Sequence, residues 1–297
     1  MVGRKLVAAL AASVAVASGV AGAALSSSHV TNLMPVLGTE DYGVGPVRVS
    51  FLLLGPQGAP VYRRDIRVWV NKARGAQPIG GHSLAVVPAV LEQIGVPGAK
   101  QDLGDITRLY VAHFRAPFAG PFSLVAQSTS GKRVVATWTI TVRKHPRAPA
   151  DGSQAIAADT PTIASTHGNL RELTTRTPPD KSLLRYSVAG SLHAHKPFVV
   201  VFATPKFCTS RTCGPVVDVV DAVRKEVGPG KTGIRYIHVE VYKDNNPGLG
   251  YNQWFKQWHL PTEPWTFLVG KDGRIKARFE GSVSVAELAA SVRKYLA

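Results

Sequence analysis

Apolar and polar residues alternate along short segments of the N-terminal half, which is the pattern of strands with one buried face. Predicted strands lie at residues 47–54, 66–70, 110–114 and 134–142. Turn sequences such as Gly55-Pro56-Gln57-Gly58 and Ser130-Gly131-Lys132 separate them. Several short alternating strands with such turns predict an all-β domain, an immunoglobulin-like sandwich, over residues 31–145.

Residues 80–105 interrupt this alternation. They hold Pro88, Gly95, Pro97 and Gly104, and the pattern predicts a long insertion with a short helix near residues 90–94. Nothing in the domain has catalytic spacing, because its His82 and His113 stand alone. The domain is therefore interpreted as an interaction or spacer module.

Residues 146–181 are rich in Pro, Ala and Thr, a composition typical of a linker that builds no core of its own. Part of it is expected to pack on the following domain, because Leu170 and Leu173 stand at helical or turn spacing.

A different pattern follows over residues 182–297. Apolar runs at 198–202, 234–241, 265–269 and 275–279 predict strands, and a Lys271-Asp272-Gly273-Arg274 turn joins the last two. Helical periodicity marks residues 216–227, 251–258 and 285–296. The resulting order, β-α-β-α-β-β-α, predicts an α/β domain.

The first residues have the pattern of a signal peptide over residues 1–24. Arg4 and Lys5 precede the apolar stretch 6–24, and Ala21-Gly22-Ala23 is a small-residue cleavage site. The alternative is an uncleaved segment that holds the protein at a membrane. Either way, we expect an exported protein of the cell envelope or extracellular space, where conditions are oxidising.

Length and charge limit the function classes. A chain of 297 residues is long enough for about two domains. The formal net charge of +16 is scattered, and no Lys/Arg block with interleaved aromatics occurs. We therefore expect attraction to acidic surface polymers or lipid headgroups rather than specific nucleic-acid binding.

The only two cysteines, Cys208 and Cys213, lie between the apolar run 198–202 and the predicted helix 216–227. A strand that delivers cysteines to a helix start is a redox-site arrangement, because a helix N-terminus favours the reactive thiolate.

These features resemble the thioredoxin-like superfamily. The resemblance covers residues 182–297 and implies a thioredoxin fold. It also implies a cis proline before the first hairpin strand, next to the redox cysteines, and Pro264 matches that position. The chain departs from the family in having Cys-x4-Cys instead of Cys-x-x-Cys. It also has Val201 where thioredoxins carry a buried aspartate.

Two registers fit the resemblance. Counted from the strand end, Cys208 takes the nucleophile position, whereas Cys213-Gly214-Pro215 matches the start of Cys-Gly-Pro-Cys. We prefer the first, because strand and helix fix where the loop ends. Residues five apart on one helix are about 7.5 Å apart along its axis, too far for a disulfide. A helix starting near Thr212 would leave Cys208 in the loop, and one starting at residue 209 or 210 would place Pro215 at a kink.

Other readings of the cysteine pair stay open. Thr204-Pro205-Lys206-Phe207-Cys208 and Cys213 resemble the active site of Q-type peroxiredoxins, although Thr204 lies one residue too early. Copper chaperones with a thioredoxin fold use a cysteine pair and a distant histidine, for which His238 and His259 are candidates. An exported cysteine pair can also be a purely structural disulfide in an interaction scaffold.

We interpret the protein as an exported thiol–disulfide oxidoreductase that acts on thiols or disulfides of envelope or secreted proteins. Cys208 attacks, Cys213 resolves the mixed disulfide, and Pro264 borders the substrate groove. An external reductant or oxidant is required, and no cofactor or metal is expected.

Glu240 is a further candidate site residue. It alternates with Val239 and Val241 in an expected central strand, where a carboxylate would be buried. There it could replace the missing aspartate as proton acceptor. In the alternative, the strand end faces solvent with His238, Glu240 and Tyr242.

Overall fold

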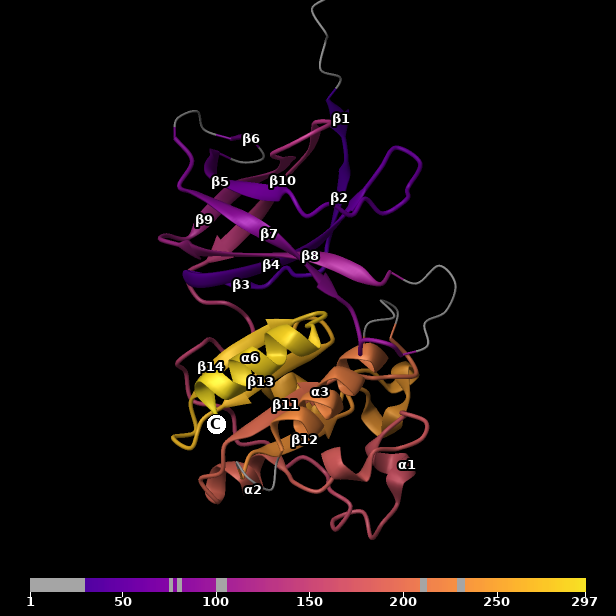
Figure 1. Cartoon of the computed structure of the whole chain (residues 1–297). Helices are drawn as coiled ribbons and strands as arrows, with labels where there is room; N and C mark the ends of the chain where they lie inside the picture. Colours follow the sequence, from indigo (N-terminus) through magenta and orange to yellow (C-terminus); the bar gives the residue numbers. More distant parts are fainter. Residues whose placement is uncertain (1–29, 75–76, 79–81, 100–105, 209–212, 229–232) are drawn as a thin grey trace, which may run out of the picture.

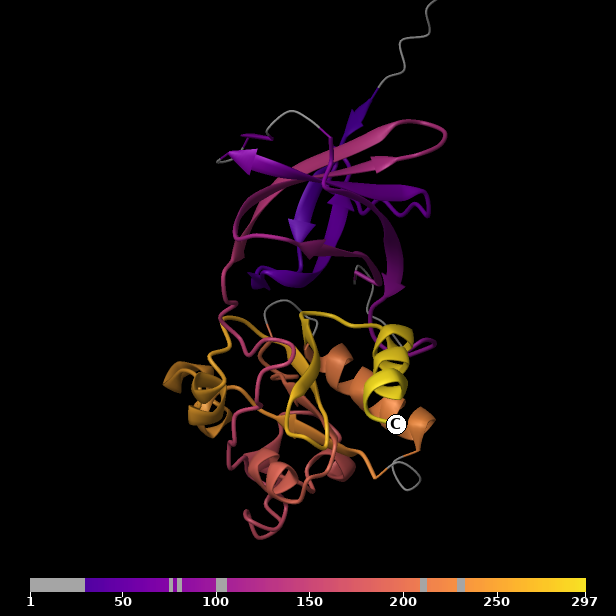
Figure 2. The ribbon, with the colours of Figure 1, turned by 90° about the vertical axis from the view of Figure 1, so that its left-hand side faces the viewer.

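The computed structural model describes residues 30–74, 77–78, 82–99, 106–208, 213–228 and 233–297. Figures 1 and 2 show two domains stacked end to end, an upper one made of strands and a lower one with both strands and helices. The expected signal peptide, residues 1–24, lies outside the described residues. Within the described part of the chain, no helix has the length and apolar content needed to cross a membrane.

Ten strands build the N-terminal domain. They are β1 (Thr31–Asn32), β2 (Met34–Leu37), β3 (Tyr42–Gly43), β4 (Gly45–Leu54), β5 (Ile66–Arg74), β6 (Gln77–Pro78), β7 (Ala85–Gln93), β8 (Arg108–Ala116), β9 (Gly120–Ser128) and β10 (Val134–Arg143). Their hydrogen-bonded order is β1-β10-β9-β5-β7-β8-β4-β2, with β3 also on β10 and β6 on β5. All four predicted strands are present.

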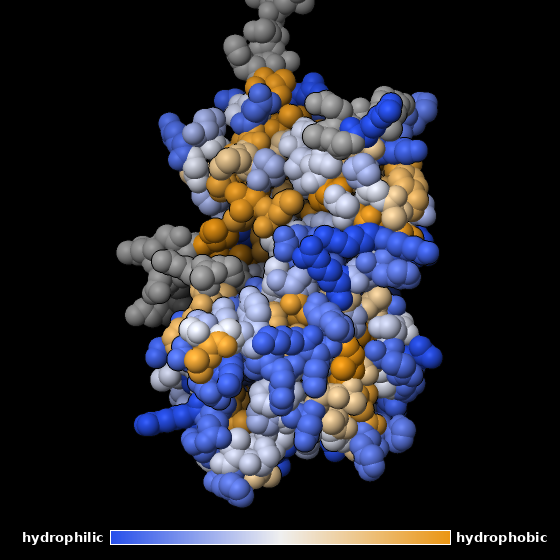
Figure 3. Space-filling model, turned by 180° about the vertical axis from the view of Figure 1, so that it is seen from behind, coloured by the Kyte–Doolittle hydropathy of each residue, from blue (hydrophilic) through white to orange (hydrophobic). Residues whose placement is uncertain are grey.

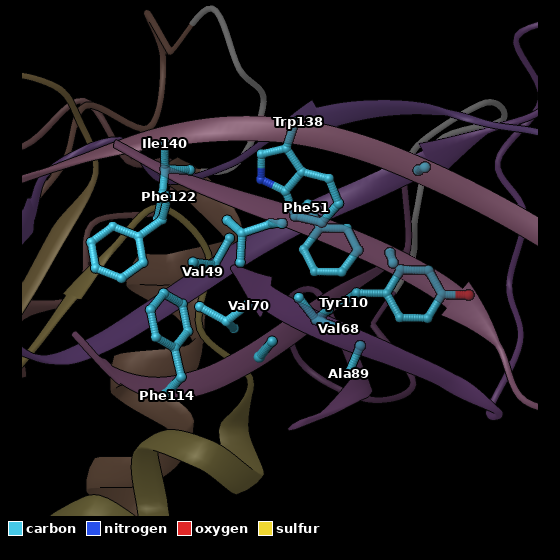
Figure 4. Close-up of a cluster of buried hydrophobic side chains, with 14 of the residues drawn as sticks. Val49, Phe51, Val68, Val70, Ala89, Tyr110, Phe114, Phe122, Trp138 and Ile140 are labelled. Carbon is cyan, nitrogen blue, oxygen red and sulfur yellow. The ribbon is translucent and has the colours of Figure 1, made fainter. Parts of the chain in front are cut away.

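Strand β7 joins two layers of this domain. Its first part, through Pro88, pairs with β5, and its second part, from Ala89, pairs with β8. Phe51 on β4 and Trp138 on β10 are not on neighbouring strands, yet their ring centroids lie 4.8 Å apart. The layers therefore face each other across one core, which Figure 4 shows. An immunoglobulin-like topology stays a prediction.

The short helix predicted near residues 90–94 is wrong, because Ala85–Gln93 is strand β7. Val86 and Val90 are exposed on this strand, whereas Ala89 is buried, so the period is two. The sequence did not predict a strand here, because Pro88 interrupts the alternation of apolar and polar residues. It is the last residue paired with β5, where the strand changes partner and a missing N–H donor is tolerated.

The first described strands leave an apolar edge. Met34, Val36 and Leu37 on β2 are exposed, and Figure 3 shows hydrophobic residues gathered on the rear face of this domain. Because an exposed apolar edge strand is suited to pairing with another chain, β2 is the place to test the predicted interaction role.

The expected linker, residues 146–181, lies against the C-terminal domain. Gly152 and Ser153 exchange backbone hydrogen bonds with Ile275 at 2.8 and 2.9 Å. Ala148 and Ala158 are buried in that domain's core, which the composition did not indicate. The segment contains helix α1 (Leu170–Leu173) and ends in the 3-10 turn η1 (Lys181–Leu183), so it is an ordered covering of the second domain.

The C-terminal domain has the predicted β-α-β-α-β-β-α order after a short extra helix. Its elements are α2 (Val188–His193), β11 (Phe198–Phe202), α3 (Cys213–Val227), β12 (Arg235–Val239), η2 (Lys243–Asn245), η3 (Pro247–Leu249), α5 (Gln253–Gln257), β13 (Trp265–Val269), β14 (Ile275–Glu280) and α6 (Val285–Tyr295). The sheet order is β12-β11-β13-β14, with β11 and β12 parallel and the other pairs antiparallel.

Strand β11 is central, and this explains its unbroken apolar sequence. Val199 and Val201 pack with α3 and α6 on one face, whereas Phe198, Val200 and Phe202 belong to the core on the other face. A strand buried on both faces needs apolar residues at every position.

Charged groups join the two domains. Arg48 on β4 forms a two-armed ion pair with Glu287 on α6, with Nε–Oε1 and Nη2–Oε2 distances of 2.7 and 2.8 Å. Glu280 Oε2 accepts hydrogen bonds from the backbone N–H groups of Glu40 and Asp41, both at 2.9 Å. At Gly281, with φ of 70°, a Cβ would lie 2.5 Å from the carbonyl oxygen of Gly38. This close approach requires glycine and shows that the domains are in tight contact.

Candidate redox site

The two cysteines flank the start of α3. Strand β11 ends at Phe202, the chain turns over residues 205–207, and Cys208 is half-buried in the loop that follows. Cys208 is disulfide-bonded, and Cys213 is the only other cysteine of the chain. The described part of helix α3 begins at Cys213, and residues 209–212, on which the two expected helix starts differ, lie outside the described residues.

Helix α3 is fixed by its apolar face. Val216, Val219, Val220 and Val223 are buried against the sheet, and this packing holds the helix start at the end of β11. Pro215 is the third described residue of the helix. The positive end of the helix dipole therefore lies at the cysteine pair, an environment that favours a thiolate.

Glu263 binds the redox loop, which we define as residues 203–208 after β11. The hydrogen bond is made at Thr204. Glu263 Oε2 accepts it from the Thr204 N–H at 3.2 Å, and Glu263 Oε1 accepts one from the Tyr242 hydroxyl at 3.0 Å. Burial raises the pKa of Glu263, the nearby Glu240 raises it further, and the two hydrogen bonds only partly oppose this. Burial raises the pKa of Tyr242 to about 12, and the Glu263 carboxyl that accepts its hydrogen bond adds to this rise.

Pro264 follows Glu263 directly and is the last residue before β13. The Glu263–Pro264 peptide bond is cis, which agrees with the geometry that the thioredoxin resemblance implies for this position. The cis proline and the Glu263 carboxylate therefore sit on one short segment beside the end of β11, opposite Thr204.

Glu240 is connected to the redox loop through Thr175. Its Oε1 accepts hydrogen bonds from the Thr175 N–H and hydroxyl at 2.6 and 2.9 Å. The same Thr175 oxygen accepts from the N–H of Lys206, two residues before Cys208, at 3.1 Å. Glu240 Oε2 is buried and has no hydrogen-bond partner among the described residues.

Both expectations about the strand of Glu240 need correction. β12 is an edge strand that ends at Val239, not a central strand, and Glu240 directly follows it. Glu240 and His238 are nevertheless only 5% and 4% exposed, so they do not face solvent. The reason is the segment after α1, since Thr174 and Thr175 cover this end of β12.

Of the two histidine candidates, His238 lies beside Glu240, with its Nε2 4.0 Å from Glu240 Oε1. His238 Nε2 lies 3.0 Å from the Ala203 carbonyl oxygen, and Nδ1 lies 3.4 Å from the Thr174 hydroxyl, so both ring nitrogens have polar partners. His259 follows α5 in a left-handed conformation, with φ of 51°. Across the described residues, no three His, Cys, Asp or Glu side chains gather as a metal site would require.

The structure adds two residues to the predicted site, Glu263 and Thr175. Glu263 stands next to Pro264 in the sequence, so its place beside the loop could have been inferred from the proline. Thr175 gave no signal, because it lies in the segment whose composition indicated a linker. The hydroxyl of Thr204, the threonine of the peroxiredoxin resemblance, is buried and makes no hydrogen bond to any described residue.

Comparisons with known proteins give little beyond this geometry. No family model matches the chain, and no curated protein matches it. A search of solved structures finds a crystal structure of a thiol:disulfide interchange protein, a thioredoxin family protein from Chlorobium tepidum TLS. It is 16% identical with a TM-score of 0.34, and the match covers 50% of this chain and 100% of that one. A likeness at this level says nothing about the activity of this chain.

Proposed function

We propose that the protein catalyses thiol–disulfide exchange through Cys208 and Cys213. The observation that carries the proposal is a half-buried, disulfide-bonded cysteine in a loop at the N-terminus of a well-packed helix. Reactive cysteines occupy partly exposed positions near a helix N-terminus, whereas buried structural cysteines are inert.

In the proposed reaction, the Cys208 thiolate of the reduced protein attacks one sulfur of a substrate disulfide. A mixed disulfide forms, and the other substrate sulfur leaves as a thiolate. The Cys213 thiolate then attacks Cys208, closes the Cys208–Cys213 disulfide and releases the second substrate thiol. Two electrons pass to the substrate, and an external dithiol must return them to the protein.

Glu240 and Glu263 are proposed as positioning residues for this chemistry. Each is bound to a backbone N–H group of the redox loop, Glu240 through Thr175 and Glu263 directly. Burial raises the pKa of Glu263, and a carboxyl group with a raised pKa is suited to exchanging protons. Pro264 is proposed to border the groove in which a substrate segment lies.

The substrates proposed are thiols or disulfides of envelope or secreted proteins, because the N-terminal sequence has the features of a signal peptide. N-terminal sequencing of exported material tests this part, and a mature chain beginning near Ala24 is expected. Recovery of the intact segment in membranes would show an anchor instead.

The exchange itself is tested by trapping. Cys213→Ser should accumulate mixed disulfides with protein partners through Cys208, and these should disappear on adding dithiothreitol. Cys208→Ser is the matched control and should trap far less. Equal trapping by both variants, or none by either, would contradict the assigned roles.

The reduction potential separates a catalyst from a structural bridge. A value above about −300 mV supports exchange, and a value well below it supports a structural disulfide in a scaffold. Reduced protein should consume hydrogen peroxide no faster than a free thiol. Rapid stoichiometric consumption of hydrogen peroxide would instead support the alternative that the protein is a thiol peroxidase.

A further inference from the structure

The loop between β7 and β8 reaches from the N-terminal domain to the redox site. Figures 1 and 2 show the chain after β7 descending from the upper domain toward α3. A Cβ placed on Gly95 would lie 3.5 Å from Cβ of Pro215, which is van der Waals contact. Pro215 lies two residues after Cys213, so this contact is made at the first turn of α3.

Val96 extends the same contact. It is half-buried and packs against the core beneath α3 and α6, the core against which Cys208 also packs. Residues of two domains therefore meet at the described start of α3 and share the core against which Cys208 packs. The turn residue Lys206, two residues before Cys208, is exposed.

The loop is held in this place from within its own domain. Ile94 is buried with Leu109 and Val111, and its N–H donates to the carbonyl of Thr107 at 2.8 Å. A turn closes from the N–H of Ala99 to the carbonyl of Val96 at 3.1 Å.

A second contact keeps the two domains in register. The Arg48–Glu287 ion pair and the Arg48 Nη2 bond to the Ser282 carbonyl oxygen, at 2.8 Å, join β4 to α6 and the segment before it. With the domains fixed there, the loop remains against α3 without needing a strong contact of its own. A rigid segment against one side of a reactive group restricts which molecules can reach it.

We propose that the described part of this loop, residues 94–99, is a steric wall of the exchange site, with Val96 as its specificity-determining residue. It hinders redox partners that approach over a broad folded surface, and it leaves the site open to extended protein segments and small thiols. The inference rests on the proposed function. It gives the N-terminal domain a role in choosing the redox partner.

Two reductants of different size test the wall. Reduction of the Cys208–Cys213 disulfide is followed with dithiothreitol and, separately, with a reduced thioredoxin. In each case a reductant thiolate attacks one protein sulfur and releases the other. The second thiol of the reductant then closes its own disulfide, so one dithiol is oxidised as the cysteine pair is reduced. The quantity compared is the thioredoxin rate divided by the dithiothreitol rate.

Val96→Ala should raise this ratio by about fivefold, the effect of losing one modest packing contact. Val86→Ala is the matched control, since Val86 lies on β7 before the loop, is exposed and pairs with Trp69 on β5 within the N-terminal domain. It should leave the ratio unchanged. Arg48→Met, which loosens the domain contact, should raise the ratio in the same direction as Val96→Ala.

An unchanged or lowered ratio in both Val96→Ala and Arg48→Met would overturn the wall, provided that both variants show the wild-type circular dichroism. Failure of the proposed function looks different. In that case neither reductant would open the wild-type disulfide faster than it opens a buried structural disulfide.

Discussion

Glu287 and Glu263 are both partly buried carboxylates of the C-terminal domain, and their surroundings move their pKa values in opposite directions. Glu287 on α6 faces the Arg48 guanidinium and His113 of the other domain, and these lower its pKa to about 2 despite burial. Glu263 faces the Tyr242 hydroxyl and the Thr204 N–H, with Glu240 nearby, and burial raises its pKa.

The difference separates a structural contact from a reactive one. A buried carboxylate with a two-armed arginine partner stays ionised and holds two surfaces together. A carboxylate whose pKa is raised by burial and by another carboxyl nearby keeps a proton more readily, which is the property of groups that exchange protons. A variant at the Arg48–Glu287 contact therefore leaves the surroundings of Glu263 unchanged, and a variant at Glu263 leaves the Arg48–Glu287 contact unchanged.

The largest effect is expected at the domain contact. Arg48→Met leaves Glu287 buried without its main cation and should lower the free energy of unfolding by about 3–5 kcal/mol. Arg293→Met is the control, because its ion pair with Glu226 is exposed on both sides and should contribute less than about 1 kcal/mol. Denaturant unfolding measures both. Equal effects of the two variants would show that Arg48 and Glu287 do not act as a buried pair.

The second effect is the acid dependence of stability. Because the folded-state pKa of Glu287 is lowered from 4.5 to about 2, its stabilisation is complete above pH 4.5 and is lost as pH falls toward 2. The loss should be about 3 kcal/mol. Burial raises the pKa of Glu280, which therefore acts in the opposite direction.

Glu287→Gln isolates the contribution of Glu287. The variant should be less stable than wild type at pH 6, and the two should converge as the pH approaches 2. Thermal unfolding across this range measures the difference, and a gap that stays constant with pH would contradict the assignment.

The parts of this fold that depend on local pattern could be predicted from the sequence. β10 alternates strictly between buried and outward-facing residues, and β11 is apolar throughout because it is central. Such features need only the periodicity of the strand or helix itself.

The parts that depend on distant segments could not be predicted. Glu240 follows an edge strand and is buried only because residues 174–175 cover it, and nothing in their composition indicates that position. The placement of Gly95 beside Pro215 depends on how two domains pack, which no periodicity records. Pro88 hid a strand because the sequence does not show where β7 changes partner.

The third prediction concerns Glu263. The rate of reduction by dithiothreitol should show an ionisation above the ordinary carboxyl range, because burial raises the pKa of Glu263. Glu263→Gln should remove that ionisation and lower the rate at pH 7 by about tenfold, less than for direct proton transfer because Glu263 acts through Thr204. Asp272→Asn, in the exposed hairpin turn, is the control and should keep the wild-type profile. A profile unchanged in Glu263→Gln would make the residue merely structural.

The smallest effect is expected at Glu240, which acts on the loop through one more residue, Thr175. In Glu240→Gln the amide oxygen can still accept both Thr175 hydrogen bonds, and the position of Oε2, which has no partner among the described residues, becomes an amide nitrogen. Stability should therefore change by less than about 1 kcal/mol. The exchange rate at pH 7 should fall only about threefold, because the charge is lost while the loop stays in place. The pH profile of the exchange rate decides between roles, since a purely structural Glu240 would leave both the rate and the profile of the variant at their wild-type values. Combining Glu240→Gln with Glu263→Gln sharpens the result, because Glu240 raises the pKa of Glu263 and the combined effect should therefore be smaller than the product of the single effects.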